Sequence, residues 1–343
     1  MLDWADEISG MYQPNGEWVD FFINGEYQGL YFLTETVEIS EDRLNIDSAN
    51  GVLVEMELYY RALPDANCIV TNRYHYWVAH SENEISTQTL KDIEVYLNDI
   101  ESALYSENGI SEISGRKLNE LLDYDSWTDA WLLKEISSDN DLGTTSQFGV
   151  VEDWNNRSVL LAGPEWDFDM TLGNGMVPWA RNPRGLVTAI PNTKGVGSIS
   201  QNRWLSQMYQ KDDFKKILIK KFADEVQPKI ARLLENEIDC YVERIRRSAL
   251  LDSLRWNGNG VQRSFSLPDN FSFGVEEDYH KYDVLEQHVD MIKDFLKEKE
   301  QFLQELWIEG VEFEVKIEEC NEEGMSLDRN NNIYTWIKKE NKK

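Results

Sequence analysis

Four aspartates in two short segments are the residues whose types and spacing best suit chemistry. Asp139 and Asp141 lie in SSDNDLGTTS, and Asp167 and Asp169 lie in GPEWDFDMTLG. Paired carboxylates on loops suit either the binding of a hard cation or acid/base work by two carboxylates. The alternative is that each aspartate caps a helix or closes a turn. The apolar surroundings of Asp167 and Asp169 favour a functional role, because an unpaired carboxylate is costly to bury.

Other catalytic patterns do not occur in the sequence. There is no GxSxG nucleophile motif and no HExxH zinc motif, and the four histidines have no ligand spacing. Cys68, Cys240 and Cys320 form no CxxC pair, which argues against a cysteine-based zinc site and against a disulfide framework.

The composition indicates a folded and strongly acidic protein. The 343 residues are 41% hydrophobic and 12% aromatic, and 34 Lys+Arg against 63 Asp+Glu give a net charge of −29. This charge repels phosphate backbones, so we expect no nucleic-acid partner, and it favours cations or basic polypeptides. No apolar run reaches the roughly 20 residues of a membrane helix, and the start does not read as a signal peptide, so we expect no membrane insertion. The length predicts two packed lobes.

The elements that position the aspartates follow from the hydrophobic pattern. Residues 17–39 place aromatic and β-branched runs on both sides of Asn24-Gly25, which predicts a β-hairpin. Residues 51–58 alternate Val, Met and Leu with partly acidic positions, which predicts a strand.

The middle of the chain predicts a helix, a polar loop and a second hairpin. Apolar residues recur every three to four positions over residues 115–137, so we expect a helix that ends near Ser137. The loop containing Asp141 follows, and then two strand-like runs on either side of the turn Asn155-Asn156. Asp167 comes directly after the second run.

The rest of the chain predicts a long loop, further helices and a small β-like tail. Residues 174–202 are rich in Gly, Pro, Asn and Ser, which is typical of an irregular segment. Apolar stripes over 203–249 and 285–306 predict helices that bury one face in the core. Residues 310–343 predict strands.

The order helix, loop with Asp141, hairpin and Asp167-Phe168-Asp169 is that of the C-terminal lobe of protein kinases. Five segments of the chain, in the order in which the family has them, resemble the CotH family of spore-coat and cell-surface proteins. This family has an atypical protein-kinase-like fold. The segments are INGEYQGLYFLTE (23–35), GVLVEMEL (51–58), KEISSDND with the serine that follows it (134–146), GPEWDFDMTLGN (163–174) and WLSQMYQKDDFKKIL (204–218).

The resemblance implies an α+β, protein-kinase-like bilobal fold. Residues 1–62 would be the remnant of a truncated, hairpin-rich N-lobe with the lobe connection. Residues 63–309 would be a mainly helical C-lobe with the catalytic-type loop and the WDFD segment, and residues 310–343 a small β-like C-terminal appendage. The implied activity is transfer of the γ-phosphate of ATP to Ser or Thr of a coat or surface protein, with Mg²⁺, Mn²⁺ or Ca²⁺. The partner would be basic or Ser-rich, and the location a spore coat or the cell exterior.

The resemblance also assigns roles to single residues. Asp141 matches the catalytic-loop aspartate of the family. Asp167 matches the metal-binding aspartate beside the ATP phosphates, and Asp169 is a second ligand or a brace for the loop. Ser146, five residues after Asp141, is a candidate metal ligand. Glu35 would lie near the segment that joins the lobes, where the adenine edge docks.

Two departures from the family pattern bear on activity. Asp139 stands where relatives usually have Asn, which adds negative charge. No glycine-containing phosphate loop or lysine-bearing strand precedes Asn24, and the first lysine is Lys91. The metal alone would then neutralise the negative charge of the ATP phosphates, unless Arg181 and Arg184 substitute for the lysine. An active kinase, a non-catalytic pseudokinase that serves in coat or surface assembly, and a two-carboxylate glycoside hydrolase all remain open.

Overall fold

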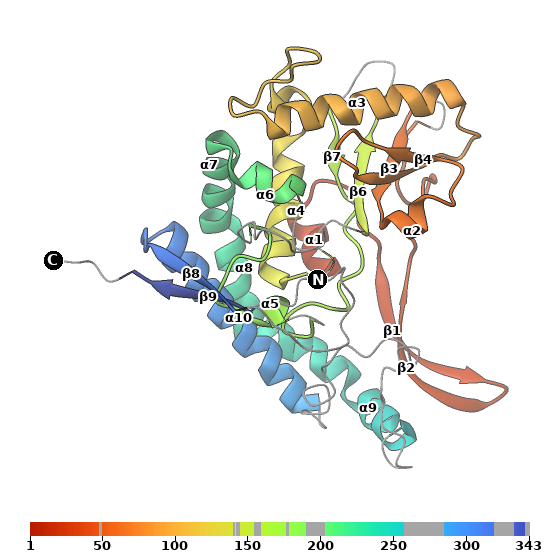
Figure 1. Cartoon of the computed structure of the whole chain (residues 1–343). Coiled ribbons are helices and arrows are strands. Elements are labelled where there is room, and N and C mark those ends of the chain that lie inside the picture. Colours follow the sequence, from red (N-terminus) through yellow and green to blue (C-terminus); the bar gives the residue numbers. More distant parts are fainter. Residues whose placement is uncertain are drawn as a thin grey trace.

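The computed structural model describes residues 1–47, 50–139, 141, 145–153, 159–175, 178–189, 203–256, 285–318 and 333–339. In these ranges the chain combines helices with small antiparallel sheets (Figure 1). The strands form an N-terminal hairpin, a five-stranded sheet in the order β4-β5-β3-β6-β7, and a C-terminal hairpin. The prediction of a mixed helix-and-sheet protein is confirmed, and the division into two kinase lobes stays a prediction.

The N-terminal hairpin consists of β1 (Gly16–Ile23) and β2 (Glu26–Thr34). Asn24 and Gly25 between them have φ values of +52° and +83°. Positive φ at both central residues is what the tightest hairpin turns require, and Asn-Gly is the pair that adopts it most readily. The hairpin predicted around these two residues is confirmed.

The five-stranded sheet is centred on β3 (Val52–Met56), which pairs with β5 (Tyr76–His80) on one side and β6 (Gln147–Val151) on the other. The edges are β4 (Cys68–Val70) and β7 (Leu161–Ala162). The predicted strand at β3 and the predicted pairing of β6 with β7 are confirmed, whereas β4 and β5 were not predicted. The turn predicted at 155–156 lies outside the described residues.

Both faces of this sheet are covered by apolar side chains. Val52 and Val54 belong to the main core, which they share with α3 (Thr87–Tyr105) and α4 (Tyr124–Ser137). Leu53 faces the other way and packs in a second cluster with Phe148 and Val150 of β6. A strand that is buried on both faces explains why Val52, Leu53 and Val54 are three apolar residues in succession.

Helix α4 is the central helix of the molecule and carries the loop with the candidate aspartates at its end. It begins after Asp123, whose side chain accepts from the backbone N–H of Ser126 at 2.8 Å. It ends at Ser137, as predicted, and Ser138 has a left-handed conformation with φ +50°. The predicted start near residue 115 is wrong, because only a 3-10 turn, Leu118–Glu120, precedes the helix. Nearly all its residues are buried, so the helix is surrounded on every side and holds the loop rigidly.

Of the remaining helices, α1, α7 and α10 pack against α4. The predicted apolar stripe after residue 203 is core, and its members Phe214, Leu218, Phe222, Val226 and Ile230 are fully buried. The bounds are α1 (Leu2–Ile8), α2 (Tyr59–Ala62), α5 (Pro178–Arg181), α6 (Arg203–Tyr209), α7 (Asp212–Lys221), α8 (Gln227–Arg232), α9 (Ile238–Trp256) and α10 (Leu285–Trp307), with π-helical turns at Phe222–Val226 and Leu233–Glu237.

The C-terminal hairpin, β8 (Phe313–Glu318) and β9 (Ile333–Lys338), confirms the strands predicted in the tail. It packs on α10, where the rings of Phe302 and Trp336 lie 5.6 Å apart. It also contacts the segment after α5, because the Asn182 side chain donates to the carbonyl of Tyr334 at 3.1 Å.

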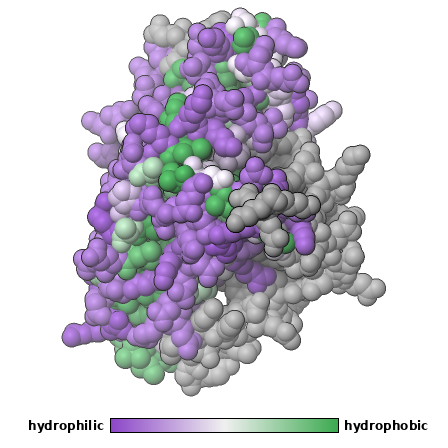
Figure 2. All heavy atoms as spheres, turned by 90° about the vertical axis from the view of Figure 1, so that its left-hand side faces the viewer, coloured by the Kyte–Doolittle hydropathy of each residue, from purple (hydrophilic) through white to green (hydrophobic). Residues whose placement is uncertain are grey.

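The surface fits the acidic composition. Figure 2 shows the side of the molecule on the left of Figure 1, and most of the described surface in this view is hydrophilic, with several hydrophobic patches. Among the described residues, no helix combines the length and the apolar character that crossing a membrane would need.

Candidate functional site

Three segments meet at the C-terminal end of α4. Asp139 and Asp141 follow the helix, Ser146 immediately precedes β6, and Asp167 follows β7. Because β6 and β7 pair, the chain returns to the start of β6, and the Ser146 hydroxyl donates to Oδ2 of Asp167 at 3.2 Å. Ser146 and Asp167 both have positive φ, +55° and +66°. Positive φ is uncommon for residues other than glycine, and such conformations are enriched at functional sites as well as in turns.

A buried lysine anchors the first of these segments. Lys134, in the last turn of α4, is 1% exposed. Its Nζ lies 2.9 Å from Oδ2 of Asp139 and 3.7 Å from Oε2 of Glu165. Burial alone would lower the pKa of Lys134, but the two carboxylates outweigh it and raise this pKa. The other oxygen of Asp139 accepts from the backbone N–H of Asp141 at 2.9 Å, so Lys134 positions Asp141 through Asp139.

The carboxylate of Asp141 lies near three other carboxylates. Burial raises its pKa to about 7, and the negative charges of Asp139, Asp167 and Asp169 add to this effect. Burial also raises the pKa of Asp169, which shares a hydrogen bond with Asp167. Ser146, Asp167 and Asp169 are therefore in contact, and Asp141 is near enough for the charges of Asp167 and Asp169 to raise its pKa. We call these four residues the carboxylate cluster, and a cation among them would relieve the repulsion between their carboxylates.

The donor set of this cluster fits a hard divalent cation in its chemistry, since carboxylate and hydroxyl oxygens are the ligands that Mg²⁺ and Ca²⁺ prefer. Asp167 and Asp169 form a close pair, with Ser146 beside them. Within the described part of the chain, no group of three or more His, Cys, Asp or Glu side chains is arranged as a ready metal site.

Glu165 is a member of the site that the sequence did not identify. It is 3% exposed, and in the described residues neither of its carboxylate oxygens has a hydrogen-bond partner. Burial raises its pKa, and Lys134 lowers it in part. Its backbone N–H donates to the side chain of Gln13 at 2.8 Å, which ties the WDFD segment to the N-terminal region. Lys134 and Glu165 could have been noticed as charged residues inside apolar runs, WLLKEIS and GPEWDF.

Glu135, the neighbour of Lys134, faces a different segment. Its carboxylate is fully buried and accepts from Lys299 Nζ at 2.6 Å. It also accepts from the backbone N–H groups of Val187 and Thr188 at 3.0 and 2.9 Å. Lys299 in turn donates to the carbonyl of Gly185 at 2.7 Å. This network, which we call the Glu135 network, fixes residues 185–188 against α4 and α10.

Three other predicted residues lie in different surroundings. Glu35 accepts from the Tyr12 hydroxyl at 3.0 Å and from the Asn15 backbone N–H at 2.8 Å, and the Asn15 bond is the main cause of its lowered pKa. It thus closes the base of the N-terminal hairpin, and its role in adenine docking stays a prediction. Arg184 pairs with Glu305 of α10 at 2.7 Å, and Arg181 is the last residue of α5.

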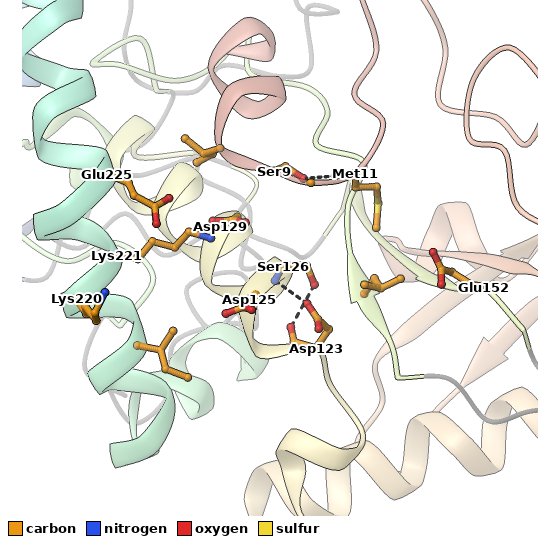
Figure 3. Close-up of a pocket in the computed structure, with 14 residues that line it drawn as sticks. Ser9, Met11, Asp123, Asp125, Ser126, Asp129, Glu152, Lys220, Lys221 and Glu225 are labelled. Atoms are coloured by element: carbon orange, nitrogen blue, oxygen red, sulfur yellow. Dashed lines mark hydrogen bonds and ion pairs between the residues drawn. The ribbon is translucent and has the colours of Figure 1, made fainter.

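A cavity of about 600 Å³ lies elsewhere, beside the first half of α4 (Figure 3). Asp123, Asp129 and Lys221 are among its lining residues, and Lys221 points at the carboxylate of Asp129 and forms an ion pair with it. Burial raises the pKa of Asp129 to about 7, and Lys221 opposes the shift. This cavity is separate from the carboxylate cluster, which follows the other end of the helix.

The structure is a mixed α/β fold in which one pair of aspartates follows a buried helix and a second pair follows a β-hairpin. The family model described as CotH kinase protein matches residues 1–303, which is most of the chain. The chain therefore belongs to the CotH family, which is kinase-like. No curated protein matches it.

Proposed function

We propose that this chain is an atypical protein kinase of the CotH type, which transfers the γ-phosphate of ATP to a Ser or Thr hydroxyl of a protein. Family membership supports this proposal. The observation that carries it is the position of Asp141, with a pKa near 7, in one cluster with Asp167 and Asp169. The net charge of −29 favours a basic acceptor. The acceptor would be a basic or Ser-rich protein of a spore coat or of the cell surface.

Asp141 would act on the proton of the acceptor. In the transfer, the hydroxyl oxygen bonds to the γ-phosphorus, and the bond from this phosphorus to the bridging oxygen breaks, so that ADP leaves with the electron pair. The hydroxyl proton moves to the Asp141 carboxylate. The hydrogen bond from the Asp141 backbone to Asp139, and the ion pair of Asp139 with Lys134, keep this loop in place.

Asp167, Asp169 and Ser146 would hold the divalent cation, and Asp167 would also face the nucleotide. The bound Mg²⁺, Mn²⁺ or Ca²⁺ neutralises charge on the phosphates. Asp167 is suited to this role because its strained backbone turns the side chain toward Ser146.

One observation favours a second candidate, a non-catalytic family member that serves in coat or surface assembly. Lys134, which contributes to the electrostatics of Asp141, already has its charge paired with Asp139 and Glu165. Arg184 is paired with Glu305. Neither cation is then available for the phosphates of ATP, which would weaken nucleotide binding.

A thermal-shift experiment with ATP and each divalent cation separates the two candidates. A ligand present at 100 times its Kd stabilises the folded state by about 2.7 kcal/mol, so a kinase should melt at a clearly higher temperature with ATP and metal together. The Asp167→Asn variant should lose this rise. The Asp141→Asn variant should keep the rise but lose transfer of labelled γ-phosphate to a Ser-rich basic peptide. Asp125→Asn, an exposed change near the start of α4, is the matched control.

The results of the thermal-shift and transfer experiments separate an active kinase, a pseudokinase and an assembly protein. No rise in melting temperature with any of the cations would eliminate the kinase and leave the assembly protein. A rise without transfer would indicate a nucleotide-binding pseudokinase. Equal transfer by the wild type and Asp141→Asn would remove the role given to Asp141.

A further inference from the structure

The C-terminal hairpin of β8 and β9 lies beside α10 (Figure 1) and packs one of its faces against the rest of the molecule. Tyr334 is 3% exposed and Trp336 is partly buried, whereas Thr335 and Ile337, which alternate with them along β9, are exposed. Side chains point to opposite faces in turn along a strand, so one face of β9 is used for packing. The family match ends at residue 303, and the whole hairpin lies beyond it.

The packed face of the hairpin contacts α5 and the residues after it. Tyr334 forms a small apolar cluster with Trp179 and Ala180 of α5 and with Val187, and all four side chains are buried. The Asn182 side chain donates to the carbonyl of Tyr334 at 3.1 Å. Isolated helices as short as α5, which has four residues, are not stable in water. Helix α5 therefore depends on these contacts for its position.

The residues after α5 are joined to the hairpin by charge and by close packing. Glu305 of α10 pairs with Arg184 at 2.7 Å and with Lys338 of β9 at 3.0 Å, so it bridges the two. A Cβ added to Gly185 would lie 2.6 Å from the Trp336 ring, and only glycine allows this ring to come so close.

Helix α5 in turn contacts the loop that carries Asp169. We call residues 163–175, which contain no helix or strand, the WDFD loop. A Cβ added to Gly175 would lie 2.5 Å from the Cβ of Ala180, so the end of the loop touches α5 directly. The side chain of the preceding residue, Asn174, donates to the carbonyl of Asp169 at 3.0 Å.

Tyr334 and Asp169 are thus joined by continuous contacts through α5, Gly175 and Asn174. A loop without regular structure takes its position from the groups that it packs against, and closely packed interiors transmit a displacement. We propose that the C-terminal hairpin holds the WDFD loop in place, with Tyr334 as a positioning residue for Asp169. This role rests on the proposed function, because Asp169 is assigned to the divalent cation only there.

The first measurement is metal binding to the full chain. The probe is Mn²⁺ alone, without nucleotide, and the electron paramagnetic resonance signal of the free ion reports how much is bound. Tyr334→Ala removes the ring that packs on α5. We expect its affinity for Mn²⁺ to fall about tenfold, the lower end of the range for residues that hold metal ligands in place. Tyr334→Phe keeps the ring and should bind Mn²⁺ as the wild type does.

The second measurement is hydrogen exchange in the metal-free protein, which follows the loop itself. The backbone N–H of Asn174 donates to the carbonyl of Thr171 at 2.9 Å. We expect this amide to exchange faster in Tyr334→Ala, because a loop that is held less firmly opens more often. In Tyr334→Phe it should exchange at the rate of the wild type.

Three further variants complete the design, and thermal unfolding verifies that each variant is folded. Asn182→Ala removes the hydrogen bond to the Tyr334 carbonyl but keeps the apolar contact. It should shift both measurements in the same direction by less, and it decides the matter if Tyr334→Ala does not fold. Thr335→Ala, on the exposed face of β9, should change neither. Ile93→Ala truncates a buried side chain of α3 and should lower stability without weakening Mn²⁺ binding.

Two results would overturn the proposal. Mn²⁺ affinity and Asn174 exchange that stay unchanged in Tyr334→Ala would show that the hairpin does not hold the loop. An equal loss of affinity in Ile93→Ala would show that the loss reflects general stability. If the wild type bound no Mn²⁺, the metal-binding role in the proposed function would fail, and exchange at Asn174 would still decide whether the hairpin positions the loop.

Discussion

Lys134 shows how one buried charge can hold a candidate site together. It is fully enclosed and has Asp139 and Glu165 as its partners. Removing one member of a buried ion pair leaves the others charged and unpaired, which commonly costs about 3–5 kcal/mol. We therefore predict that Lys134→Met lowers the free energy of unfolding by about this amount, measured by urea denaturation.

The matched control is Lys220→Met. Lys220 pairs with Asp224 on the surface, with its side chain 78% exposed, and solvent screens such pairs strongly. We expect almost no change in unfolding for this variant. If the two variants were equally stable, Lys134 would not be the anchor of the loop that carries Asp141.

Asp129 predicts a pH dependence of stability. Its pKa is raised from 3.8 to about 7 in the folded protein, mainly by burial. The unfolded chain releases this proton first as the pH rises, so the contribution of Asp129 to stability falls between about pH 4 and pH 7 and is constant above. In Asp129→Asn this part of the pH dependence should disappear, as measured by urea unfolding at pH 5 and pH 7. The exposed Asp125→Asn should retain it.

At the scale of elements, the Glu135 network joins α4, α10 and residues 185–188. In Glu135→Gln, the buried Lys299 would lose its counter-charge, although an amide oxygen could still accept from the backbone. We predict faster hydrogen exchange at the amides of Val187 and Thr188. Glu298→Gln, an exposed change beside Lys299, should leave this exchange unchanged. Unaltered exchange in Glu135→Gln would mean that other contacts fix the segment.

Elements set by local rules could be predicted from the sequence, and those set by distant partners could not. Asn24-Gly25 determines its own turn, and the end of α4 at Ser137 follows from the change to the polar residues of SSDND. Strand β4 has three residues and exists because it pairs with β5, which itself depends on β3. Nothing local marks so short a strand.

The candidate site divides in the same way. Asp141 and Asp167 were predicted from segment order, and the negative charge of Asp167 contributes to the raised pKa of Asp141. Their roles in a site stay predictions. Lys134 and Glu165 were missed because a charged residue in a sequence usually lies on the surface. Only the packing of α4 against the loop before Phe168 shows that these two charges face each other.

At the scale of the whole molecule, the net charge of −29 predicts a salt effect. Like charges repel across a compact surface, and dissolved ions screen them beyond roughly 10 Å at 0.1 M salt. We therefore expect the melting temperature to rise between 10 mM and 200 mM NaCl at pH 7. Sucrose, which is uncharged, serves as a control for general solute effects. A fall in melting temperature with salt would show that local ion pairs such as Lys229 with Glu237 outweigh the repulsion.

The Glu135 network also constrains how the molecule is made. Its two charged members are separated by 164 positions along the chain, so a ribosome must have synthesised residue 299 before the network can close. Contacts between such distant positions form slowly, because a long loop must close first. The segment that packs beside α4 would then be secured only after α10 has been synthesised, and a nascent chain interrupted before α10 would carry the carboxylate loops without this support.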